Sequence, residues 1–181
     1  MQNKHKSADS VLNEIIIRKS KVSDLSGIAK LTKEGVDSGK WLYTGSNKFK
    51  KEKIEKLKKS IISKKPELYH FIAIDKKNKK IVGMCHCSFK KSGRTRHRVD
   101  CGWSIHPDYF GQGIGTKMLS YMLDYLKKKG FKRAEAEMAI VNKASWKLAL
   151  KCGFKIEGTK KKALLTDDGK YIDTYIVGKM L

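Results

Sequence analysis

Apolar residues recur along this chain with two periods, one typical of strands and the other of helices. Short apolar or alternating runs, such as NEIIIR at 13–18 and YHFIAI at 69–74, predict β-strands. Apolar residues three and four positions apart predict helices instead. The chain has no internal repeat and no Pro- or Ser-rich linker, so we expect one folded domain.

The first third of the chain predicts one strand and two helices. After the strand at 13–18, Ser23 and Asp24 offer N-cap side chains to a helix that Gly35 is expected to end. The apolar stripe of this helix is Leu25, Ile28 and Leu31. The segment 48–65 predicts a second, amphipathic helix whose solvent face is coated with lysine.

The middle of the chain predicts an antiparallel meander. The runs 69–74 and 80–89 flank the polar turn DKKNK, in which Asn78 can adopt a positive φ, and together they predict a β-hairpin. After a polar loop around Gly93, the run 97–106 predicts a further strand.

A helical period follows Pro107 and a group of glycines. The apolar stripe of this helix is Ile114, Met118, Leu119, Met122, Leu123 and Leu126. Gly130 comes directly after the stripe and is typical of a helix C-cap.

The last third predicts a strand at 132–140, a short helix at 143–152 and two strands at 154–165 and 170–181. Asp168-Gly169 between the last two strands is a strong hairpin signal. The expected order is therefore β-α-α-β-β-β-α-β-α-β-β, an α/β (α+β) arrangement.

The chain has 181 residues, which is enough for one core of substantial size. We expect a flexible polar lead-in over residues 1–12 and a single domain over residues 13–181. No apolar run approaches the roughly 18–20 residues of a membrane span, and the start MQNKHKSADS lacks the apolar region of a secretory signal. Four cysteines do not predict a disulfide scaffold at this length. We therefore expect a cytoplasmic protein with no membrane association.

Charge adds a preference for anionic partners. There are 41 Lys and Arg residues against 18 Asp and Glu residues, a net charge of +23. Such a surplus favours nucleic acid, phosphorylated cofactors or acidic surfaces. The lysines are spread along the chain without aromatic interleaving, and no nucleic-acid motif occurs. Charge thus supports an anionic ligand without naming it.

The segment FGQGIGT at 110–116, between an expected strand and helix, carries the most specific chemical signal. Glycine at every second position exposes backbone N–H groups to one anion, and the dipole of the following helix adds to the attraction. A tight turn without a ligand would need the same glycines. The spacing GxGxG matches neither a Walker A loop nor a Rossmann fingerprint. A phosphate or pyrophosphate cradle and a plain turn both remain open from this segment alone.

The stretch 102–154 resembles the GNAT family of N-acetyltransferases. It contains the strand end WSIHP, the glycine loop, Asn142 at the start of a helix, and Gly153 and Phe154 at its end, all at the family's spacings. The resemblance implies a single-domain GNAT-like fold, with a mixed, mostly antiparallel, twisted sheet of about seven strands flanked by about four helices. It also implies acetyl-CoA (CoA) as the cofactor.

The resemblance also assigns roles to residues. The backbone of Trp103, Ser104 and Ile105 would pair with the pantetheine arm and the thioester carbonyl. The amides that would hold the pyrophosphate are those of Gly111, Gln112, Gly113, Ile114, Gly115 and Thr116. Asn142 and Ser145 would lie beside the cofactor, where the two central strands separate. The implied reaction is direct attack of a neutral amine, which needs a proton acceptor and donors for the oxyanion and the thiolate.

Two positions depart from the family pattern. Phe110 stands where the family usually has arginine or glutamine, and we expect this to tune affinity because main-chain amides hold the anion. Ala149 stands where many members have a tyrosine that protonates the thiolate, so that proton donor is missing. The alternative proton donors for the thiolate are water, Cys152, Tyr171 and Tyr175.

Two carboxylates are candidates for the catalytic proton acceptor. Glu137 lies five residues before Asn142, in the position of the glutamate used by family members that acetylate protein N-termini. It would equally suit an ordinary polar position on a strand face. Asp100 shares a strand face with Gly102 and Ser104 by alternation and would reach the amine through water.

Two other groups of residues could form sites, namely Cys85-His86-Cys87 and the pair Trp41 and Tyr43. In a strand, Cys85 and Cys87 face one side and His86 the other, and no second ligand pair lies at finger spacing. We therefore expect no metal, and buried thiols instead. Trp41 and Tyr43 either line the acceptor site, in a region that resembling proteins use for it, or form a hydrophobic plug.

The sequence thus predicts an acyl-CoA-dependent N-acetyltransferase that moves an acetyl group from acetyl-CoA to a primary amine, either a protein N-terminus or a small amine. One alternative on the same fold is a CoA-binding protein with weak or no catalysis, which Ala149 motivates. The other is a basic RNA- or ribosome-associated protein. Expected partners are the amine and, weakly, acidic surfaces or RNA, and the chain is expected to be a monomer or homodimer.

Overall fold

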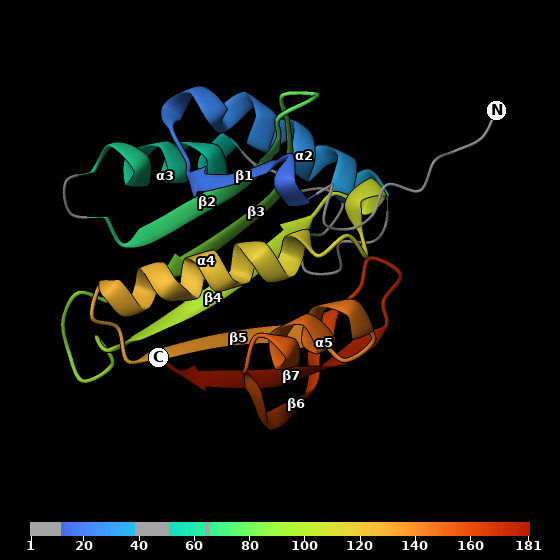
Figure 1. Ribbon diagram of the computed structural model, residues 1–181. Coiled ribbons are helices and arrows are strands. Elements are labelled where there is room, and N and C mark those ends of the chain that lie inside the picture. The colour runs from blue at the N-terminus through green and yellow to red at the C-terminus, as the bar shows by residue number, and fades with distance from the viewer. Residues whose placement is uncertain (1–11, 39–50, 64–65) are drawn as a thin grey trace.

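The computed structural model describes residues 12–38, 51–63 and 66–181, and these residues place seven strands in one sheet (Figure 1). The strand order is β1-β2-β3-β4-β5-β7-β6, and every neighbouring pair is antiparallel except β4 and β5. The strands are β1 (Ile15–Lys19), β2 (Leu68–Asp75), β3 (Lys80–Ser88), β4 (Arg98–Ile105), β5 (Arg133–Ala139), β6 (Lys155–Leu165) and β7 (Tyr171–Met180). The mixed, mostly antiparallel sheet is the one that the sequence predicts.

Helices cover both faces of this sheet. The helices are α2 (Leu25–Asp37), α3 (Lys51–Ile62), α4 (Ile114–Lys128) and α5 (Lys143–Lys151), with 3-10 turns η1 (Val22–Asp24) and η2 (Pro107–Tyr109). The first two pack against β2 and β3 on one face, and α4 packs on the other face together with α5 (Figure 1). The predicted order of helices and strands is confirmed.

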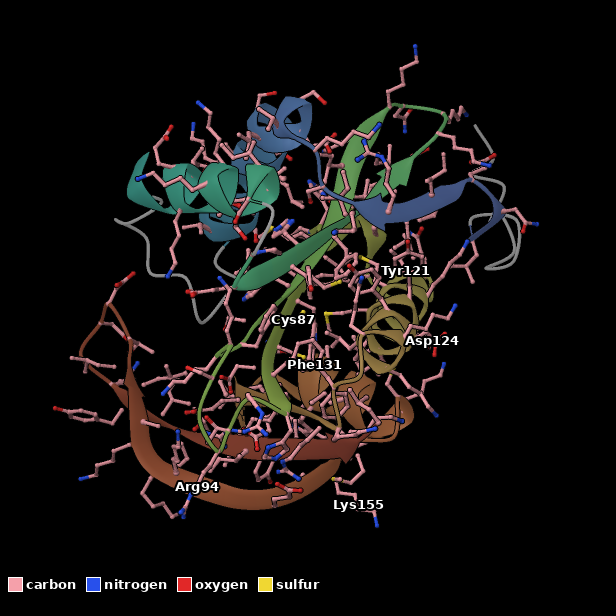
Figure 2. All side chains as sticks on the ribbon, turned by 90° about the vertical axis from the view of Figure 1, so that its left-hand side faces the viewer. Cys87, Arg94, Tyr121, Asp124, Phe131 and Lys155 are labelled. Carbon is pink, nitrogen blue, oxygen red and sulfur yellow. The ribbon has the colours of Figure 1, made fainter. Side chains whose placement is uncertain are left out.

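The main core lies between α4 and the sheet. The predicted stripe of α4 is buried at all six positions, Ile114, Met118, Leu119, Met122, Leu123 and Leu126. The stripe packs against inward-facing strand residues such as Phe71, Val99 and Val177. Burial of each large side chain contributes about 1.5–3 kcal/mol, so this layer is a major source of stability. Figure 2 labels Cys87, which is fully buried, Phe131, which is partly buried against the main core, and Lys155, which is exposed at the edge of the molecule.

A second core lies under α2 and α3. Ile28 and Leu31 of α2 and Leu57 of α3 pack against Ile72 and Ile81 of the sheet. Because β2 and β3 contribute alternate residues to the two cores, both faces of these strands are packed over most of their length, and His86 of β3 remains exposed. Among the described residues, no helix is long and apolar enough to cross a membrane.

Three local expectations were wrong. Gly35 does not end α2, which continues to Asp37 with Gly35 buried inside it, because packing overrides one residue's helix propensity. Asp24 precedes α2, but its carboxylate accepts hydrogen bonds from Arg18 and the Lys21 amide instead of capping that helix.

The positive φ of the β2–β3 turn falls on Lys79 (φ 53°) and not on Asn78. The Asp75 carboxylate accepts the amides of Lys77 and Asn78, and the side chain of Asn78 donates back to it. The hairpin turn itself lies at DKKNK as predicted, and only its left-handed residue is one position later than expected.

The lead-in expected over residues 1–12 lies almost entirely outside the described residues, as do Trp41 and Tyr43. Its last residue, Leu12, packs against the main core. The Lys117 ammonium donates to the carbonyl oxygens of Leu12 and Ile15, at 2.6 and 3.1 Å, so α4 is tied to the start of β1.

The parallel pair β4 and β5 separates part of the way along. Pairing is confined to residues 98–100 of β4 and 133–135 of β5. Beyond them β4 continues to Ile105 paired only with β3, and β5 continues to Ala139 paired with β7. The sheet therefore opens at its centre, beyond Asp100 and Glu135 (Figure 1).

Candidate active site

A cleft of about 1150 Å³ occupies the opening between β4 and β5. One wall is the end of β4 and the glycine loop that follows it, and the other is β5 and the first turns of α5. Residues of both sheet faces line it, from Ile105 and Ile114 on the α4 side to Glu135 and Glu137 on the opposite side. A ligand in this cleft would therefore contact residues from both faces of the sheet.

The glycine loop forms the mouth of the cleft on the α4 side. Gly111 and Gly113 have φ values of 76° and 78°, in the left-handed region that favours glycine. Gly113 is the N-cap of α4, whose first-turn N–H groups have no acceptor within the helix. Gly115 packs closely against α5, because a Cβ there would lie 2.8 Å from Cδ2 of Leu148 and would displace that side chain. Loop and helix thus present backbone donors and a positive helix end to the cleft.

Most of the expected pyrophosphate residues line this part of the cleft, namely Gly111, Gly113, Ile114, Gly115 and Thr116. Gln112 is not among the lining residues, and its side-chain amide donates to the carbonyl of Asp108 at 3.0 Å. The side chain of Phe110 lines the cleft and is 46% exposed. An apolar ring therefore stands where the family usually has a polar side chain.

The end of β4 supplies an edge of backbone to the cleft. Trp103, Ser104 and Ile105 line it, and their strand is paired with β3 on one side and not with β5 on the other. The indole Nε1 of Trp103 is the one buried side-chain polar atom that lacks a hydrogen-bond partner within the described parts of the chain. An extended ligand with amide groups would fit along such an edge.

The start of α5 closes the other wall. Asn142 is the N-cap of α5, and its Oδ1 accepts the Ser145 amide at 3.1 Å. Both predicted residues line the cleft, and the Asn142 side chain caps the helix there. Lys147 and Lys151 line the same wall. The sequence interpretation missed these two lysines, although their i, i+4 spacing after Asn142 places them on one helix face.

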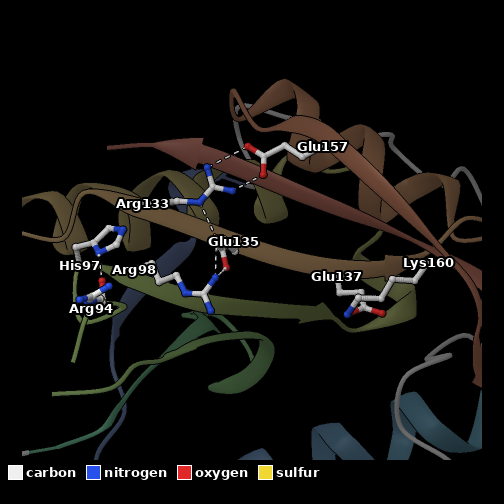
Figure 3. Close-up of polar contacts among 8 residues, drawn as sticks. All are labelled: Arg94, His97, Arg98, Arg133, Glu135, Glu137, Glu157 and Lys160. Atoms are coloured by element: carbon white, nitrogen blue, oxygen red, sulfur yellow. Dashed lines mark hydrogen bonds and ion pairs between the residues drawn. The ribbon is translucent and has the colours of Figure 1, made fainter. Parts of the chain in front are cut away.

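Carboxylates gather on the opposite side of the sheet opening. Asp100 is the last β4 residue that is paired with β5, and its exposed side chain lines the cleft. The two oxygens of Glu137 accept from Thr174 Oγ1 at 2.7 Å and from Lys160 Nζ at 2.5 Å (Figure 3). The sheet therefore brings both predicted proton acceptors to one cleft but gives them different surroundings.

Glu135 lies between these two carboxylates on the same face and belongs to an ion-pair network. It pairs with Arg98 at 3.0 Å and with Arg133 at 2.6 Å, and Arg133 also pairs with Glu157 of β6 (Figure 3). Hydrogen bonds to Glu157 and Glu135 raise the pKa of Arg133 above its ordinary value. The network holds β4, β5 and β6 together below the opening.

A second polar cluster anchors the segment before the glycine loop. His106 Nε2 lies 3.2 Å from Glu34 and 3.1 Å from Lys80, and its Nδ1 accepts the Asp108 amide. Burial opposes ionisation of Glu34, but Lys80 and His106 outweigh it, so the pKa of Glu34 lies below its ordinary value. Nearby, Tyr109 donates to Asp75 at 2.8 Å. Both contacts fix η2 to the β2–β3 hairpin and to α2.

Ala149 is fully buried in the main core, so α5 presents no hydroxyl at this position. None of the three side chains suggested as alternative proton donors, Cys152, Tyr171 and Tyr175, is among the residues that line the cleft. Burial also raises the pKa of the Cys152 thiol.

The Cys85-His86-Cys87 run has the alternation that the sequence predicts. Both cysteines are fully buried in the main core, and burial raises the pKa of Cys87 to about 12. Within the described ranges no group of three or more His, Cys, Asp or Glu could hold a metal ion. His86 faces the other way as predicted and is exposed, and it lines the cleft, a position that no sequence signal indicated.

A family model described as "Acetyltransferase (GNAT) family" matches residues 37–154, which include β4, the glycine loop and α5. A comparison with curated proteins finds no match. Many solved structures share the fold at low sequence identity.

Three of these structures illustrate the likeness. A GNAT-family acetyltransferase from Streptococcus pneumoniae is 24% identical, with a TM-score of 0.78 over 93% of this chain and 100% of that one. The ribosomal-protein-S5-alanine acetyltransferase of Vibrio fischeri is 23% identical, with a TM-score of 0.79 over 92% and 93%. A phosphinothricin acetyltransferase from Sinorhizobium meliloti, solved with acetyl-CoA, is 22% identical, with a TM-score of 0.79 over 93% and 89%.

Proposed function

The chain belongs to the GNAT family of acetyltransferases, and from this premise we propose that it transfers an acetyl group from acetyl-CoA to a primary amine. The amine belongs to a protein N-terminus or to a small molecule, and it attacks the thioester directly. The observation that carries this proposal is the opening between β4 and β5, with a positive-φ glycine loop on one side and carboxylates on the other.

The residues of the α4 side fit acetyl-CoA. The loop offers backbone donors at the start of a 15-residue helix, which suits a pyrophosphate. Lys147 and Lys151 place two positive charges on the adjacent wall for further phosphate groups. The edge of β4 from Trp103 to Ile105 suits the amide groups of the pantetheine arm, and Asn142 and Ser145 flank it across the opening. When bound, the cosubstrate supplies the activated acetyl group.

The opposite side suits an amine. Its carboxylates Asp100 and Glu137 would attract an ammonium group into an otherwise strongly basic protein. Each of them is a candidate for the proton acceptor, directly or through an ordered water molecule. The fold neighbours include a spermidine N-acetyltransferase and a ribosomal-protein-S5-alanine acetyltransferase, so both small amines and protein N-termini belong in a test.

Ala149 favours a second candidate function, a CoA-binding protein with little or no turnover. Its buried methyl group cannot protonate a thiolate, so in the main proposal that proton comes from the amine nitrogen through water. Binding of acetyl-CoA without acetylation of any amine would favour this second function. Tight, salt-sensitive RNA binding without acetyl transfer would favour an RNA-associated role instead.

The loop is tested by calorimetry with acetyl-CoA and CoA. Gly111→Val places a β-branched residue at φ 76°, where a Cβ would meet nothing within 4 Å, so its effect comes from backbone conformation. We expect at least a tenfold loss of affinity for both ligands. Gly130→Val is the matched control, because Gly130 has φ 85° and equally open surroundings at the far end of α4.

Gly130→Val should retain wild-type affinity despite a similar strain of about 1–2 kcal/mol. Normal binding by Gly111→Val would make the loop a plain turn. Absence of binding by the wild type would reject the proposal altogether.

Acetyl transfer is tested by release of free CoA thiol from acetyl-CoA. The amines are Ala-, Ser- and Met-initiated peptides, spermidine, an aminoglycoside and single amino acids. Turnover of at least one amine well above hydrolysis is expected. Hydrolysis alone, with normal acetyl-CoA binding, would leave the CoA-binding function as the better description.

A further inference from the structure

His86 occupies a position at the cleft that depends on a glycine in the next strand. It lies on β3 directly opposite Gly102 of β4, on the sheet face away from α4. A Cβ at position 102 would lie 2.6 Å from Cε1 of His86 and 2.9 Å from its Nε2. The imidazole therefore lies over the backbone of Gly102, in space that any larger residue would occupy.

Gly102 is also at the point where the sheet opens. It follows Asp100, the last β4 residue that is paired with β5, by two positions. Since the ring lies across β4 at this point, it reaches toward the opening from the side proposed for the amine, and it lines the cleft with Asp100, Ser104 and Glu137.

The carboxylates on this face are less suited to take a proton. Glu137 has a hydrogen bond on each oxygen, one of them from the Lys160 ammonium, and a proton would have to compete with that ion pair. Glu135 is paired with Arg98 and Arg133. Asp100 is exposed, but a carboxylate is intrinsically a weaker base than an imidazole.

On this basis we infer that His86 is the group that takes the proton from the incoming amine, a role that rests on the proposed acetyl transfer. The ammonium R–NH₃⁺ gives one proton to an imidazole nitrogen and becomes R–NH₂. Its lone pair attacks the thioester carbonyl, so a C–N bond forms and the C–S bond breaks. The second nitrogen proton passes through water to the CoA thiolate, and the imidazolium returns its proton to solvent. Asp100 stabilises the imidazolium.

Titratable and charged groups surround His86 on several sides. From β2, the ring of His70 is stacked on it, with 6.3 Å between centroids and 6° between planes. From β4, Asp100 and Arg98 lie on the same face, and from β5, Glu135 lies beside Asp100 and Glu137 lies across the opening. The ionisable residues of α2, which packs on β3 from this side, are Lys30, Lys33, Glu34 and Asp37.

The test compares His86→Gln and His86→Ala with His97→Gln, which changes an exposed histidine outside the cleft. The acceptor is the amine with the highest turnover in the panel above, and kcat/KM is measured from pH 5.5 to 9. We expect kcat/KM to fall at least 100-fold in both His86 variants. The rise of kcat/KM with pH that an imidazole base produces should also disappear from their pH profiles. Calorimetric affinity for acetyl-CoA should change less than twofold, and His97→Gln should match the wild type.

Added imidazole should restore part of the activity of His86→Ala, which a purely structural role would not allow. The assignment is overturned if His86→Gln stays within threefold of the wild type, or if Asp100→Asn or Glu137→Gln removes the rise of kcat/KM with pH that His86→Gln retains.

A second measurement does not depend on turnover. In protein labelled with ¹³C and ¹⁵N at histidine, saturating acetyl-CoA should shift the ring signals of His86 and leave those of His97 in place. Unmoved His86 signals in a protein that binds acetyl-CoA by calorimetry would overturn the role of His86 while leaving the proposed function intact. Failure to bind acetyl-CoA at all would reject the proposed function and this role with it.

Discussion

His70 is buried in β2 and remains neutral, so it makes stability depend on pH. Its Nδ1 lies 2.6 Å from Ser20 Oγ, and burial, with the charge of His86, lowers the pKa of His70 from 6.5 to about 3. Because the folded pKa lies below the unfolded value, the unfolded chain binds more protons between these pH values, and stability falls as pH falls through that window. We expect urea denaturation to show a loss of roughly 2–3 kcal/mol between pH 7.5 and 4.5.

The quantity to compare between variants is the change in the free energy of unfolding with pH, and not its absolute value. His70→Gln keeps an acceptor for Ser20 but cannot titrate, so its free energy of unfolding should change less over the same interval. His97→Gln removes an exposed histidine and should keep the wild-type slope. If His70→Gln were as acid-sensitive as the wild type, other groups would cause the effect.

Individual glycines divide into those that local sequence explains and those that it does not. Gly130, Gly153 and Gly169 follow helices or sit in a hairpin turn, and each has a positive φ. These roles follow from neighbouring residues in the chain. Gly102 has no positive φ. Glycine suits this position because the imidazole of His86, on another strand, occupies the space that a Cβ would take. Sequence could not reveal this, because the contact depends on how β3 and β4 pair.

At the scale of elements, Gly178 of β7 makes room for the ion-pair network. A Cβ there would lie 2.5 Å from Nη2 of Arg133 and would also meet the Glu157 carboxylate. Gly178→Ala should therefore separate this pair and lower stability by about 1–2 kcal/mol, measured by chemical denaturation. The loosened attachment of β6 should also appear as faster amide exchange in that strand.

Gly158 of the neighbouring strand provides the matched control. A Cβ at this position would meet only Cδ1 of Ile176 at 3.8 Å, an ordinary contact. Gly158→Ala should change stability by no more than about 0.5 kcal/mol. Equal losses of stability in the two variants would show that alanine destabilises this hairpin in general, and not through the ion pair of Arg133 and Glu157.

Long, strongly periodic elements were predicted most completely. Every residue of the α4 stripe is buried as expected, because an amphipathic helix of four turns fixes its own inner face. The end of α2 and the residue that carries the positive φ in the β2–β3 turn were predicted wrongly. There, contacts of the helix with the sheet and of the Asp75 side chain with the turn decide the outcome, and neither belongs to the local pattern.

At the scale of the whole molecule, the net charge of +23 should matter less for CoA than the placement of two lysines. Lys147→Gln with Lys151→Gln removes two charges from the cleft wall. Lys127→Gln with Lys128→Gln removes the same charge from the last turn of α4, at the other end of that helix from the loop. Calorimetry at 50 mM NaCl should show at least a fivefold loss of CoA affinity for the first pair and less than twofold for the second.

Salt should reduce this difference, because screening weakens charges that are exposed to solvent. At 500 mM NaCl the affinities of wild type and Lys147→Gln/Lys151→Gln protein are expected to approach each other. Equal losses for the two double variants at low salt would show that CoA responds to total charge and not to the cleft.

The sequence by itself determined the order of elements, the buried face of α4, the glycine loop and the family, since each depends on residues that are close together in the chain. Only the tertiary structure decided which polar groups face the opening between β4 and β5. His86, Asp100, Glu137 and Lys147 come from four different elements, and the sheet order and the end of β4–β5 pairing bring them to one cleft. Local periodicity can say that a side chain points out of a strand, but strand pairing decides what it meets there.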